Sequence, residues 1–355
     1  MKLSKSWNRF HYLWLLLLLA GLSSCKHDNL EIDKANENFR PAADFIKNNY
    51  DLSLFAAAVE KAGMNEQLNG AGPFTILAPD NNAFNMIGIN RPSDFDKMNP
   101  DSLKYMVQSH ILNERLLRRD IPFNGIDVRY RTLAGNEVYA SVSDRSSTDN
   151  LLFFSGAFVS RFDVTLANGN LNVLNRVIKY EPKVTVQEWL DKRPDYSILV
   201  SGLKKFGLWE QLAKDGSNTV VAPKNSVFEA AGMTAEVVAA MNTDRYIGSR
   251  LFGCYVLKDK HFFISDFDVL GSINGDAFYY HPIAGDTYIM VFTVGGFNGN
   301  LTYHIETRTS RFGLYEIISN ASGRNQKAFD NLLDNGLVQD LDNVIILPEQ
   351  AMKTN

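Results

Sequence analysis

Histidine and aspartate side chains are grouped in the last third of the 355-residue chain, and both residue types bind divalent metal ions. They are His261, Asp266, Asp268, His281 and His304. None has a recognised ligand spacing, such as two histidines four positions apart on one helix face. Alternating strands can present such residues on a solvated face without any ligand. We therefore expect no metal site.

Signatures of catalysis are missing from the sequence. It contains no glycine-rich phosphate loop that opens a helix, no G-x-S-x-G motif and no cysteine–histidine pair in a suitable context. A glycoside hydrolase needs two carboxylates that flank a cleft, and no motif nominates such a pair. We expect a protein that is not an enzyme, with no catalytic residue and no cofactor.

Cys25 has the most specific chemical context in the chain. It follows a basic start, an apolar run over residues 13–22 and two serines, which is the layout of a secretory signal. The run is about half of the roughly 20 residues that a membrane-spanning helix needs. The segment "LSSC" (Leu22–Cys25) resembles the lipobox of bacterial lipoproteins, in which the cysteine is lipidated and becomes the first residue. The alternative is a plain signal peptide with an incidental cysteine.

The residues around Cys25 predict a membrane anchor and a tether. We assign residues 1–24 to the signal peptide and 25–40, with "KHDNLEIDKANEN", to a flexible tether. Several acyl chains on one cysteine suffice for stable anchoring. Acidic residues soon after the cysteine resemble the surface-export signal of Bacteroidetes lipoproteins, which implies a lipid anchor in the outer membrane with the protein exposed on the cell surface. A periplasm-facing anchor is the alternative.

Charge and cysteine content narrow the partners further. Loss of residues 1–24 removes three positive charges, so the net charge falls from −4 to −7. This acidity argues against a nucleic-acid partner, which would need a basic stripe. The second cysteine, Cys254, lies in an apolar run and is expected to be a buried, inert thiol. With Cys25 lipidated, no internal disulfide can form.

Two nearly identical decapeptides show an internal duplication. "TILAPDNNAF" begins at Thr75, and "TVVAPKNSVF" begins 144 positions later at Thr219. The same offset aligns residues 50–68 with residues 194–212, without a gap across roughly 40 residues. In each copy the pattern predicts a helix, then a short apolar strand ended by proline, then a capped turn.

These blocks resemble the motifs of fasciclin (FAS1) domains. The first motif supplies residues expected to be structural: Thr75, Pro79, Asn81 and Phe84, and in the second copy Thr219, Pro223, Asn225 and Phe228. The second motif is seen in "NGNLNVLNRVIKYEP" (Asn168–Pro182) and more loosely in "NGLVQDLDNVIILPE" (Asn335–Glu349). The resemblance implies an α+β fold of two tandem domains, each a β-wedge of two small sheets packed with several helices.

The motifs also set the domain bounds. We assign residues 41–183 to the first FAS1 domain, 184–350 to the second and 351–355 to a tail. The second copy holds about 23 extra residues between its motifs, in a stretch that begins "HFFISDFDVLGSI". Alternating apolar residues and glycine-rich turns predict consecutive hairpins there, giving a larger sheet or a protruding hairpin.

His110 is the residue of the family's Tyr-His block that this chain retains. Ser109 stands where the tyrosine would be, and a constant offset of 144 aligns His110 with Cys254. A thiol cannot perform the acid–base work of an imidazole, so we expect His110 to make a structural hydrogen bond. A ligand-binding or catalytic role is the alternative. Because the block is degraded and no RGD tripeptide is present, integrin-type adhesion is not inferred.

Three further positions are candidates for contact or modification. Trp209 aligns with polar Asn65, which predicts an exposed indole and nominates it as a ligand contact. Ser102 lies in "DSL", which resembles the O-glycosylation site of Bacteroidetes, although Asp101 or Ser102 could simply cap a helix. The basic stretch "RLLRRD" (Arg115–Asp120) is expected to be a solvated patch.

The resemblance implies a surface-anchored, non-catalytic binding or adhesion module that contacts protein or extracellular-matrix partners. FAS1 lipoproteins of this kind often accompany SusC/SusD-type glycan uptake systems. The alternative is therefore an accessory glycan-binding lipoprotein of such a complex, with extracellular polysaccharide and SusC/SusD-like proteins as partners.

Overall fold

The computed structural model describes residues 39–353 apart from positions 124, 145–149, 215, 274–277, 284–285, 298–299, 310–316 and 325–327. Cys25, the predicted signal peptide and nearly all of the predicted tether lie outside these residues. Residues 40–355 belong to one structural unit, which contains both repeats. Within the described part of the chain, no helix is long and apolar enough to cross a membrane.

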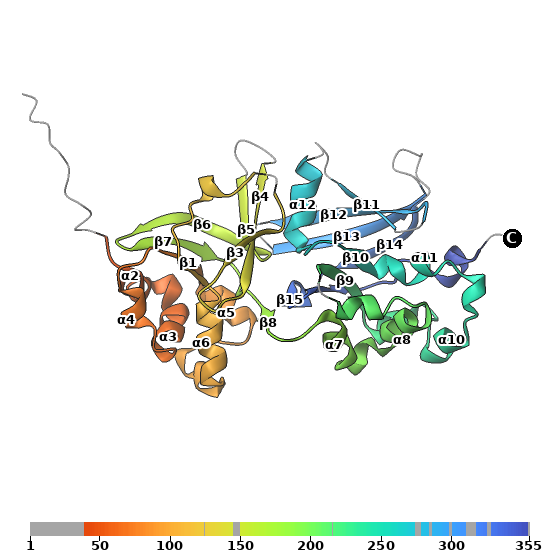
Figure 1. The fold of residues 1–355 in the computed structure, drawn as a ribbon, viewed down its shortest axis with the longest axis horizontal. Coiled ribbons are helices and arrows are strands. Elements are labelled where there is room, and N and C mark those ends of the chain that lie inside the picture. Colours follow the sequence, from red (N-terminus) through yellow and green to blue (C-terminus); the bar gives the residue numbers. More distant parts are fainter. Residues whose placement is uncertain are drawn as a thin grey trace, which may run out of the picture. The chain divides into compact units, whose positions relative to one another are not determined.

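The helices of the first repeat form where apolar residues recur on one face. In α3 the buried residues Leu54, Phe55, Ala58 and Val59 share a face, and the helix ends before Gly63, whose φ of 69° is left-handed. The helices are α2 (Ala42–Lys47), α3 (Ser53–Lys61), α4 (Asn65–Leu68), α5 (Asn81–Met86) and α6 (Pro100–Gln108). Helices α2, α3, α4 and α6 gather on one side of the sheet (Figure 1).

The strands of the first repeat form a wedge. They are β1 (Phe74–Pro79), β2 (Ile111–Leu112), β3 (Val128–Arg131), β4 (Glu137–Asp144), β5 (Asn150–Phe154), β6 (Ala157–Leu166) and β7 (Gly169–Leu174). Their order is β2-β1-β7-β6-β5-β4-β3, with β1 and β7 parallel and the other pairs antiparallel. Register shifts between Val159 and Val164 bend β6, and an isolated bridge from Leu112 to Thr132 links the two ends of the sheet. An apolar cluster that includes Leu77, Val142 and Phe154 lies inside.

The second repeat begins with the same elements. Its helices are α7 (Val186–Asp191), α8 (Ser197–Lys205), α9 (Asn225–Ala230), α10 (Ala235–Ala240), α11 (Gly248–Leu251) and α12 (Ile264–Ile273). One sheet has the order β10-β9-β16-β15-β8, from β8 (Tyr180–Glu181), β9 (Asn218–Pro223), β10 (Val256–Lys258), β15 (Asn331–Leu333) and β16 (Gly336–Leu341). Strand β8 comes from the segment that joins the repeats.

The duplication is visible in the pairing of the strands. Each of α2, α3, β1 and α5 has a counterpart of its own type 144 positions later, in α7, α8, β9 and α9. Strands β1 and β7 pair in parallel from Phe74 and Gly169, as β9 and β16 do from Asn218 and Gly336. Pro79 and Pro223 each end a strand that is buried along its whole length. The prediction of two like α+β domains is confirmed.

The predicted hairpins are present in the second part of the inserted stretch, but its first part forms a helix instead. A four-stranded antiparallel meander follows residue 278, from β11 (Tyr279–Pro282), β12 (Ile289–Phe297), β13 (Asn300–Arg308) and β14 (Ile317–Gly323). Residues 264–273, which we expected in a hairpin, form helix α12 instead. Helix α12 packs against β4 of the first repeat and β12 of the second. Because residues 261–269 are all buried, their apolar side chains show no helical period and imitate a strand.

Candidate functional site

Asn81 and Asn225, from the first motif, tie the turn after the strand to the preceding helix. The Asn81 Oδ1 atom accepts a hydrogen bond from the Leu54 N–H at 3.0 Å, and its Nδ2 donates to the Tyr50 carbonyl at 2.8 Å. Asn225 makes the same two bonds to the residues 144 positions further on, each at 2.9 Å. Both side-chain amides are therefore engaged in hydrogen bonds within their own repeat.

Thr75 and Thr219 have an equally local task. The Thr75 hydroxyl donates to the Glu114 carbonyl at 2.7 Å and accepts from the Leu116 N–H at 2.8 Å. Thr219 makes the corresponding pair of bonds at 3.1 and 2.9 Å. The other motif residues, Phe84 and Phe228, are fully buried. The side chains of the first motif thus fasten loops and fill the core.

The second motif supplies an asparagine–glycine pair whose structural role the sequence analysis did not single out. The Asn168 Nδ2 atom donates to the carbonyls of Leu68 and Gly70 at 2.8 and 2.6 Å, and its Oδ1 accepts from the Ala42 N–H at 3.0 Å. Asn335 makes the same three bonds in the second repeat, at 2.8 to 2.9 Å. A Cβ at Gly169 or Gly336 would lie 2.0 Å from a backbone oxygen of the parallel strand, so only glycine fits.

His110 is buried and bonded through both ring nitrogens. Its Nδ1 lies 2.8 Å from the Met106 carbonyl, and its Nε2 accepts from the Ile178 N–H at 3.0 Å. Since Nε2 is an acceptor, the ring is the neutral Nδ1–H tautomer. Burial lowers the pKa of His110 to about 4 from its ordinary value of 6.5. The structure thus places His110 between two backbone groups of its own domain.

The counterpart of His110 is Tyr255 and not Cys254. Leu112 pairs with Thr75 and Leu257 pairs with Thr219, so the offset between the repeats has grown from 144 to 145 at this point. The Tyr255 hydroxyl accepts from the Ile345 N–H at 3.1 Å, as His110 does from Ile178. Our alignment of His110 with Cys254 was therefore wrong by one residue. Cys254 itself is fully buried, and burial raises the pKa of its thiol.

Trp209 is buried, so the predicted exposed contact is wrong. Its exposed fraction is 6%, and the Lys204 ammonium lies 4.8 Å from the centre of its ring. Asn65 begins α-helix α4, whereas Trp209 precedes a 3-10 helix over Glu210–Ala213. Burial of an indole is favourable by a few kcal/mol, whereas burial of an asparagine side chain is not. The altered turn allows the Trp209 ring to pack against the core.

The remaining predicted positions lie apart from one another. Ser102 is exposed in the first turn of α6, and the residue that caps this helix is Asn99, not Asp101 or Ser102. His261 and Asp266 are buried at the junction of the two repeats, whereas His304 bonds to Ser322 at 3.0 Å. Among the residues that the structure describes, no three histidine, cysteine or acidic side chains converge to hold a metal ion.

The junction of the repeats is built around Asp330, which precedes β15. Its Oδ2 atom accepts from Arg176 of the first repeat at 3.0 Å. Its Oδ1 atom accepts from the Ile264 N–H at 3.1 Å and from Gln339 at 2.9 Å. Asp330 is 5% exposed and has a φ of 54°. One carboxylate therefore joins the segment after β7, helix α12 and strand β16.

A second polar contact crosses the junction near α12. His261 Nδ1 lies 3.2 Å from the Asp127 carboxylate, and its ring lies 4.5 Å from the ring of Tyr139. Asp266 bonds to Ser141 of β4 and accepts from the Phe263 N–H at 3.0 Å. Burial raises the pKa of Asp266 to about 8, so its carboxyl is largely protonated at neutral pH.

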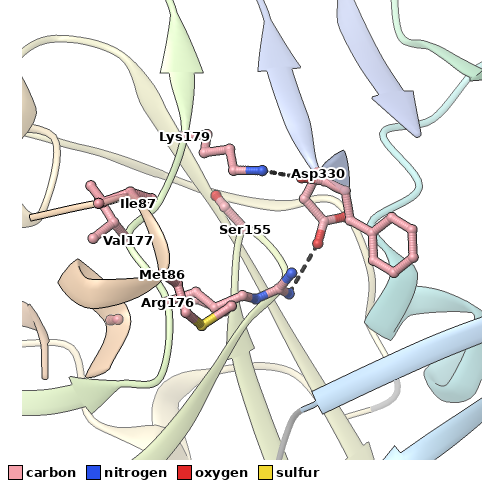
Figure 2. Close-up of a pocket in the computed structure, with 11 residues that line it drawn as sticks. Met86, Ile87, Ser155, Arg176, Val177, Lys179 and Asp330 are labelled. Carbon is pink, nitrogen blue, oxygen red and sulfur yellow. Dashed lines mark hydrogen bonds and ion pairs between the residues drawn. The ribbon is translucent and has the colours of Figure 1, made fainter. Parts of the chain in front are cut away.

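A pocket of about 460 Å³ opens beside Asp330. Its walls come from the end of α5, the β5–β6 turn, the segment after β7 and the residues before β15. Figure 2 shows Lys179 and Arg176 pointing toward Asp330, with Ser155 between them and with Ile87 and Val177 on the far side. The Lys179 ammonium donates to the Phe329 carbonyl at 2.8 Å. The pocket is therefore apolar on one side and cationic on the other.

A second candidate site is an exposed aromatic–arginine patch on the first repeat, formed by Arg118, Phe123 and Phe162. Phe123 and Phe162 are 52% and 47% exposed, and the Arg118 guanidinium lies 5.9 and 5.0 Å from their ring centres. Phe162 stands in the bent part of β6, beside Asp163, whose φ is 55°. The bulge turns Phe162 outward, although an apolar residue in a strand would normally be expected to face the core.

A polar pocket of about 640 Å³ also lies on the first repeat, and its lining includes Ser160 and Arg161 of β6. It is lined by Tyr50, which is 87% exposed, and by amides and carboxylates that include Asp51, Asn82, Asn85 and Asn90. The sequence analysis missed all three sites because their residues are scattered along the chain. Only the basic stretch "RLLRRD" pointed to one of them, through Arg118.

The fold and its repeated motif bonds define a class of protein, a tandem of two like α+β domains. A fasciclin-domain family model matches residues 50–180. The chain is 30% identical over 176 residues to the transforming growth factor-beta-induced protein ig-h3 of Sus scrofa, and 28% identical over 185 residues to periostin of Homo sapiens. These matches span 49% and 52% of this chain but only 24% and 20% of the two relatives.

A solved FAS1 domain pair from the insect cell adhesion molecule fasciclin I is similar over 84% of this chain and 98% of that chain, with 19% identity and a TM-score of 0.38. By the family-model match, residues 50–180 therefore form a fasciclin (FAS1) domain. The second repeat of the chain has the same motif bonds as this domain, so the fold is a tandem of two FAS1-like domains.

Proposed function

We propose that this chain is a non-catalytic binding or adhesion module that is held at the outer membrane through lipidated Cys25 and contacts protein or matrix partners. The observation that carries the proposal is the exposed patch of Arg118, Phe123 and Phe162. Aromatic and arginine side chains are enriched in protein–protein interfaces and supply most of their binding energy.

The motif side chains are already buried or hydrogen-bonded within their own repeat, which supports a binding role over a catalytic one. His110, Asn81 and Thr75 each bond to backbone groups of their own repeat, and the Cys254 thiol is buried with a raised pKa. A thiol in that state is a poor nucleophile. Partner contact would instead use side chains that the fold leaves half exposed.

The test is a pull-down from solubilised outer membranes with the full chain as bait. We expect discrete membrane or matrix proteins to co-purify, and we expect F123S/F162S to reduce their yield at least tenfold. Val237→Ser is the matched control, because Val237 is 43% exposed on α10 of the second repeat. Equal yields from the bait and from F123S/F162S would contradict the patch as the contact surface.

The anchor needs a separate test. Metabolic labelling with radioactive palmitate should mark the chain, and Cys25→Ser should abolish the label and release the protein from the membrane fraction. Protease added to whole cells then distinguishes a surface-exposed chain, which is cleaved, from one that faces the periplasm. Label that persists in Cys25→Ser would remove the lipid anchor from the proposal.

Glycan binding is the second candidate, and the polar pocket at Tyr50 favours it. An exposed aromatic face next to several amides and carboxylates suits a sugar ring, because the ring stacks on the aromatic while its hydroxyls bond to the polar groups. A glycan array should then show binding that Tyr50→Ala abolishes and Phe123→Ala preserves. Such a result would support an accessory role in a SusC/SusD-type uptake complex, and binding unaffected by Tyr50→Ala would argue against this pocket.

A further inference from the structure

Two of the four charged side chains that line the polar pocket of the first repeat are already used by the fold. The Asp80 carboxylate caps helix α5, and the Arg91 guanidinium lies 3.5 Å from the Asp94 carboxylate. The other two are Asp51 and Arg161. Within the part of the chain that the structure describes, neither the Asp51 carboxylate nor the Arg161 guanidinium has a hydrogen bond or an ion pair. The pocket therefore keeps one acceptor and one donor of opposite charge.

These two charges come from separate parts of the pocket wall. Asp51 belongs to the 3-10 helix that begins at Tyr50, and it lies close enough to Asp80 to add to the rise that burial causes in the pKa of Asp80. Arg161 of β6 is paired with Val173 of β7, and β7 in turn pairs with β1, the strand that precedes Asp80. Since neighbouring strands lie about 4.8 Å apart, the Arg161 backbone is about 10 Å across the sheet from β1. The acidic side of the pocket and its cationic side are thus distinct.

The neutral groups between these two sides suit a sugar. Tyr50 is 87% exposed and presents an aromatic face. Asn82 and Asn85 are exposed, and their side-chain amides make no hydrogen bond within the described residues. Amides both donate and accept, as sugar hydroxyls do, and an aromatic face stacks on the apolar face of a pyranose ring. At about 640 Å³ the space lies in the range that small-molecule sites occupy.

We propose that this pocket binds an acidic sugar, a pyranose that carries one carboxylate, and that Arg161 binds this carboxylate. The ring stacks on Tyr50, and its hydroxyls bond to Asp51 and to the amides of Asn82 and Asn85. A guanidinium and a carboxylate are both planar and form a bidentate, charge-assisted pair. One unused cation matches one negative charge, and the width of the sheet keeps that charge away from the acidic side. The inference rests on the glycan-binding role proposed above for the same pocket.

Calorimetric titration of the full chain tests the proposal. The probes are tetragalacturonate and tetramannuronate, which offer α- and β-linked rings, and the full methyl ester of each, which keeps the ring and loses the charge. At least one acid should bind saturably, and its ester should bind roughly tenfold more weakly or worse. Tetraglutamate, which carries the charges without the rings, should not bind.

The outcomes separate this inference from the role on which it rests. Equal affinity for an acid and its ester would overturn the acidic-sugar inference and leave the glycan-binding role standing. No binding of acids or esters up to millimolar concentration would overturn both. Binding of tetraglutamate as tight as that of the acids would show a general attraction of anions and would also contradict the proposal.

Two substitutions test the assignment of the residues. Arg161→Gln should weaken binding of the acid roughly tenfold or more and should leave the ester unchanged, because Arg161 bonds to the carboxylate alone. Tyr50→Ala should weaken the acid and the ester by similar factors, because both stack the same ring. Arg119→Gln is the matched control, since Arg119 is exposed on the same repeat and does not line the pocket. Acid affinity that survives Arg161→Gln, or an ester affinity that falls with it, would contradict the assignment.

Arg91 is the other cation of the pocket and provides the last comparison. Because Arg91 is paired with Asp94, Arg91→Gln should weaken binding of the acid less than Arg161→Gln does. Both arginines are exposed, so both variants should keep the melting temperature of the wild type. A larger loss of acid affinity in Arg91→Gln would place the carboxylate on Arg91 and overturn the role of Arg161.

Discussion

His110 in the first repeat and Tyr255 in the second occupy the same place with different chemistry. Each offers a side-chain acceptor, a ring nitrogen in His110 and a hydroxyl oxygen in Tyr255, to the N–H of an isoleucine in the second motif, Ile178 at 3.0 Å and Ile345 at 3.1 Å. A tyrosine can replace the histidine here because the fold needs a buried acceptor at this point, and both side chains provide one. This position of the Tyr-His block therefore serves the architecture, not acid–base catalysis.

The two repeats differ most in the elements that lie after His110 and Tyr255. In the first repeat the chain goes on into β3, β4 and β5 of one wedge, whereas in the second it forms α12 and the four-stranded meander. The shared part of the domain is thus the parallel pair of strands with its helices, and the variable part is the sheet beyond it. Four predictions test how far this equivalence extends.

The largest effect is expected at the glycines of the parallel pair. Gly169→Ala and Gly336→Ala would each put a Cβ 2.0 Å from a backbone oxygen, and we expect a loss of on the order of 3 kcal/mol or more in the free energy of unfolding. Gly63→Ala is the control, since it meets no atom within 4 Å and should cost only about 1 kcal/mol of left-handed strain. Urea unfolding measures all three. A similar cost for Gly169→Ala and Gly63→Ala would refute the close approach.

The next effect concerns the paired asparagines. Asn168→Ala and Asn335→Ala each leave two carbonyls and one N–H without their partner, which should cost about 3 kcal/mol in either repeat. Asn99→Ala, which removes only the cap of α6, should cost about 1 kcal/mol. Thermal or urea unfolding gives the comparison. If either Asn168→Ala or Asn335→Ala lowered the free energy of unfolding only as much as Asn99→Ala, the two asparagine sites would not be equivalent.

Acid should distinguish His110 from Tyr255. The folded pKa of His110, about 4, lies below its ordinary value of 6.5, so the unfolded chain binds one more proton between these pH values. Stability is therefore complete above pH 6.5 and falls by about 3 kcal/mol as the pH drops to 4. His110→Phe should be less stable at pH 7 but should lose this part of the acid dependence. Tyr255→Phe should cost about 1 to 2 kcal/mol and leave the acid dependence unchanged.

Urea unfolding between pH 7 and pH 4 measures these slopes. Identical acid dependence in the wild type and His110→Phe would mean that His110 is not a buried neutral ring.

Asp266 should give an effect of opposite sign. Burial raises its folded pKa to about 8 from 3.8, so the folded protein holds a proton that the unfolded chain releases. Its contribution is complete below pH 4 and is lost as the pH rises toward 8. Asp266→Asn mimics the protonated carboxyl, so we expect a flatter stability profile between pH 5 and pH 8 and greater stability than the wild type at pH 8. An unchanged slope between these pH values would contradict a protonated Asp266.

Local patterns made much of the fold predictable. The gapless offset of 144 predicted the repeated helix, strand and turn, because buried positions in α3 and β1 keep their spacing in α8 and β9. Helix α12 was not predictable, since burial on all sides removes the helical period. The equivalence of His110 and Tyr255 was hidden by a single inserted residue, which only the pairing of Leu257 with Thr219 reveals.

The candidate sites were less accessible to prediction than the fold. The junction pocket combines residues near positions 87, 155, 177 and 330, which only the folded chain brings together. Phe162 faces solvent because β6 is bent, and no local pattern signals the bend. Trp209 misled us because its aligned partner Asn65 is exposed, while the larger apolar ring is laid on the core.

The central claim is that the motif side chains stabilise the fold and take no part in chemistry. An NMR-monitored pH titration of the His110 ring tests this claim most directly. The hydrogen bonds to Met106 and Ile178 require the neutral Nδ1–H tautomer to persist from pH 8 down to about pH 4. A ring that titrates near 6.5, or whose Nε2 carries the proton at neutral pH, would contradict this structural role and return His110 to the residues available for chemistry.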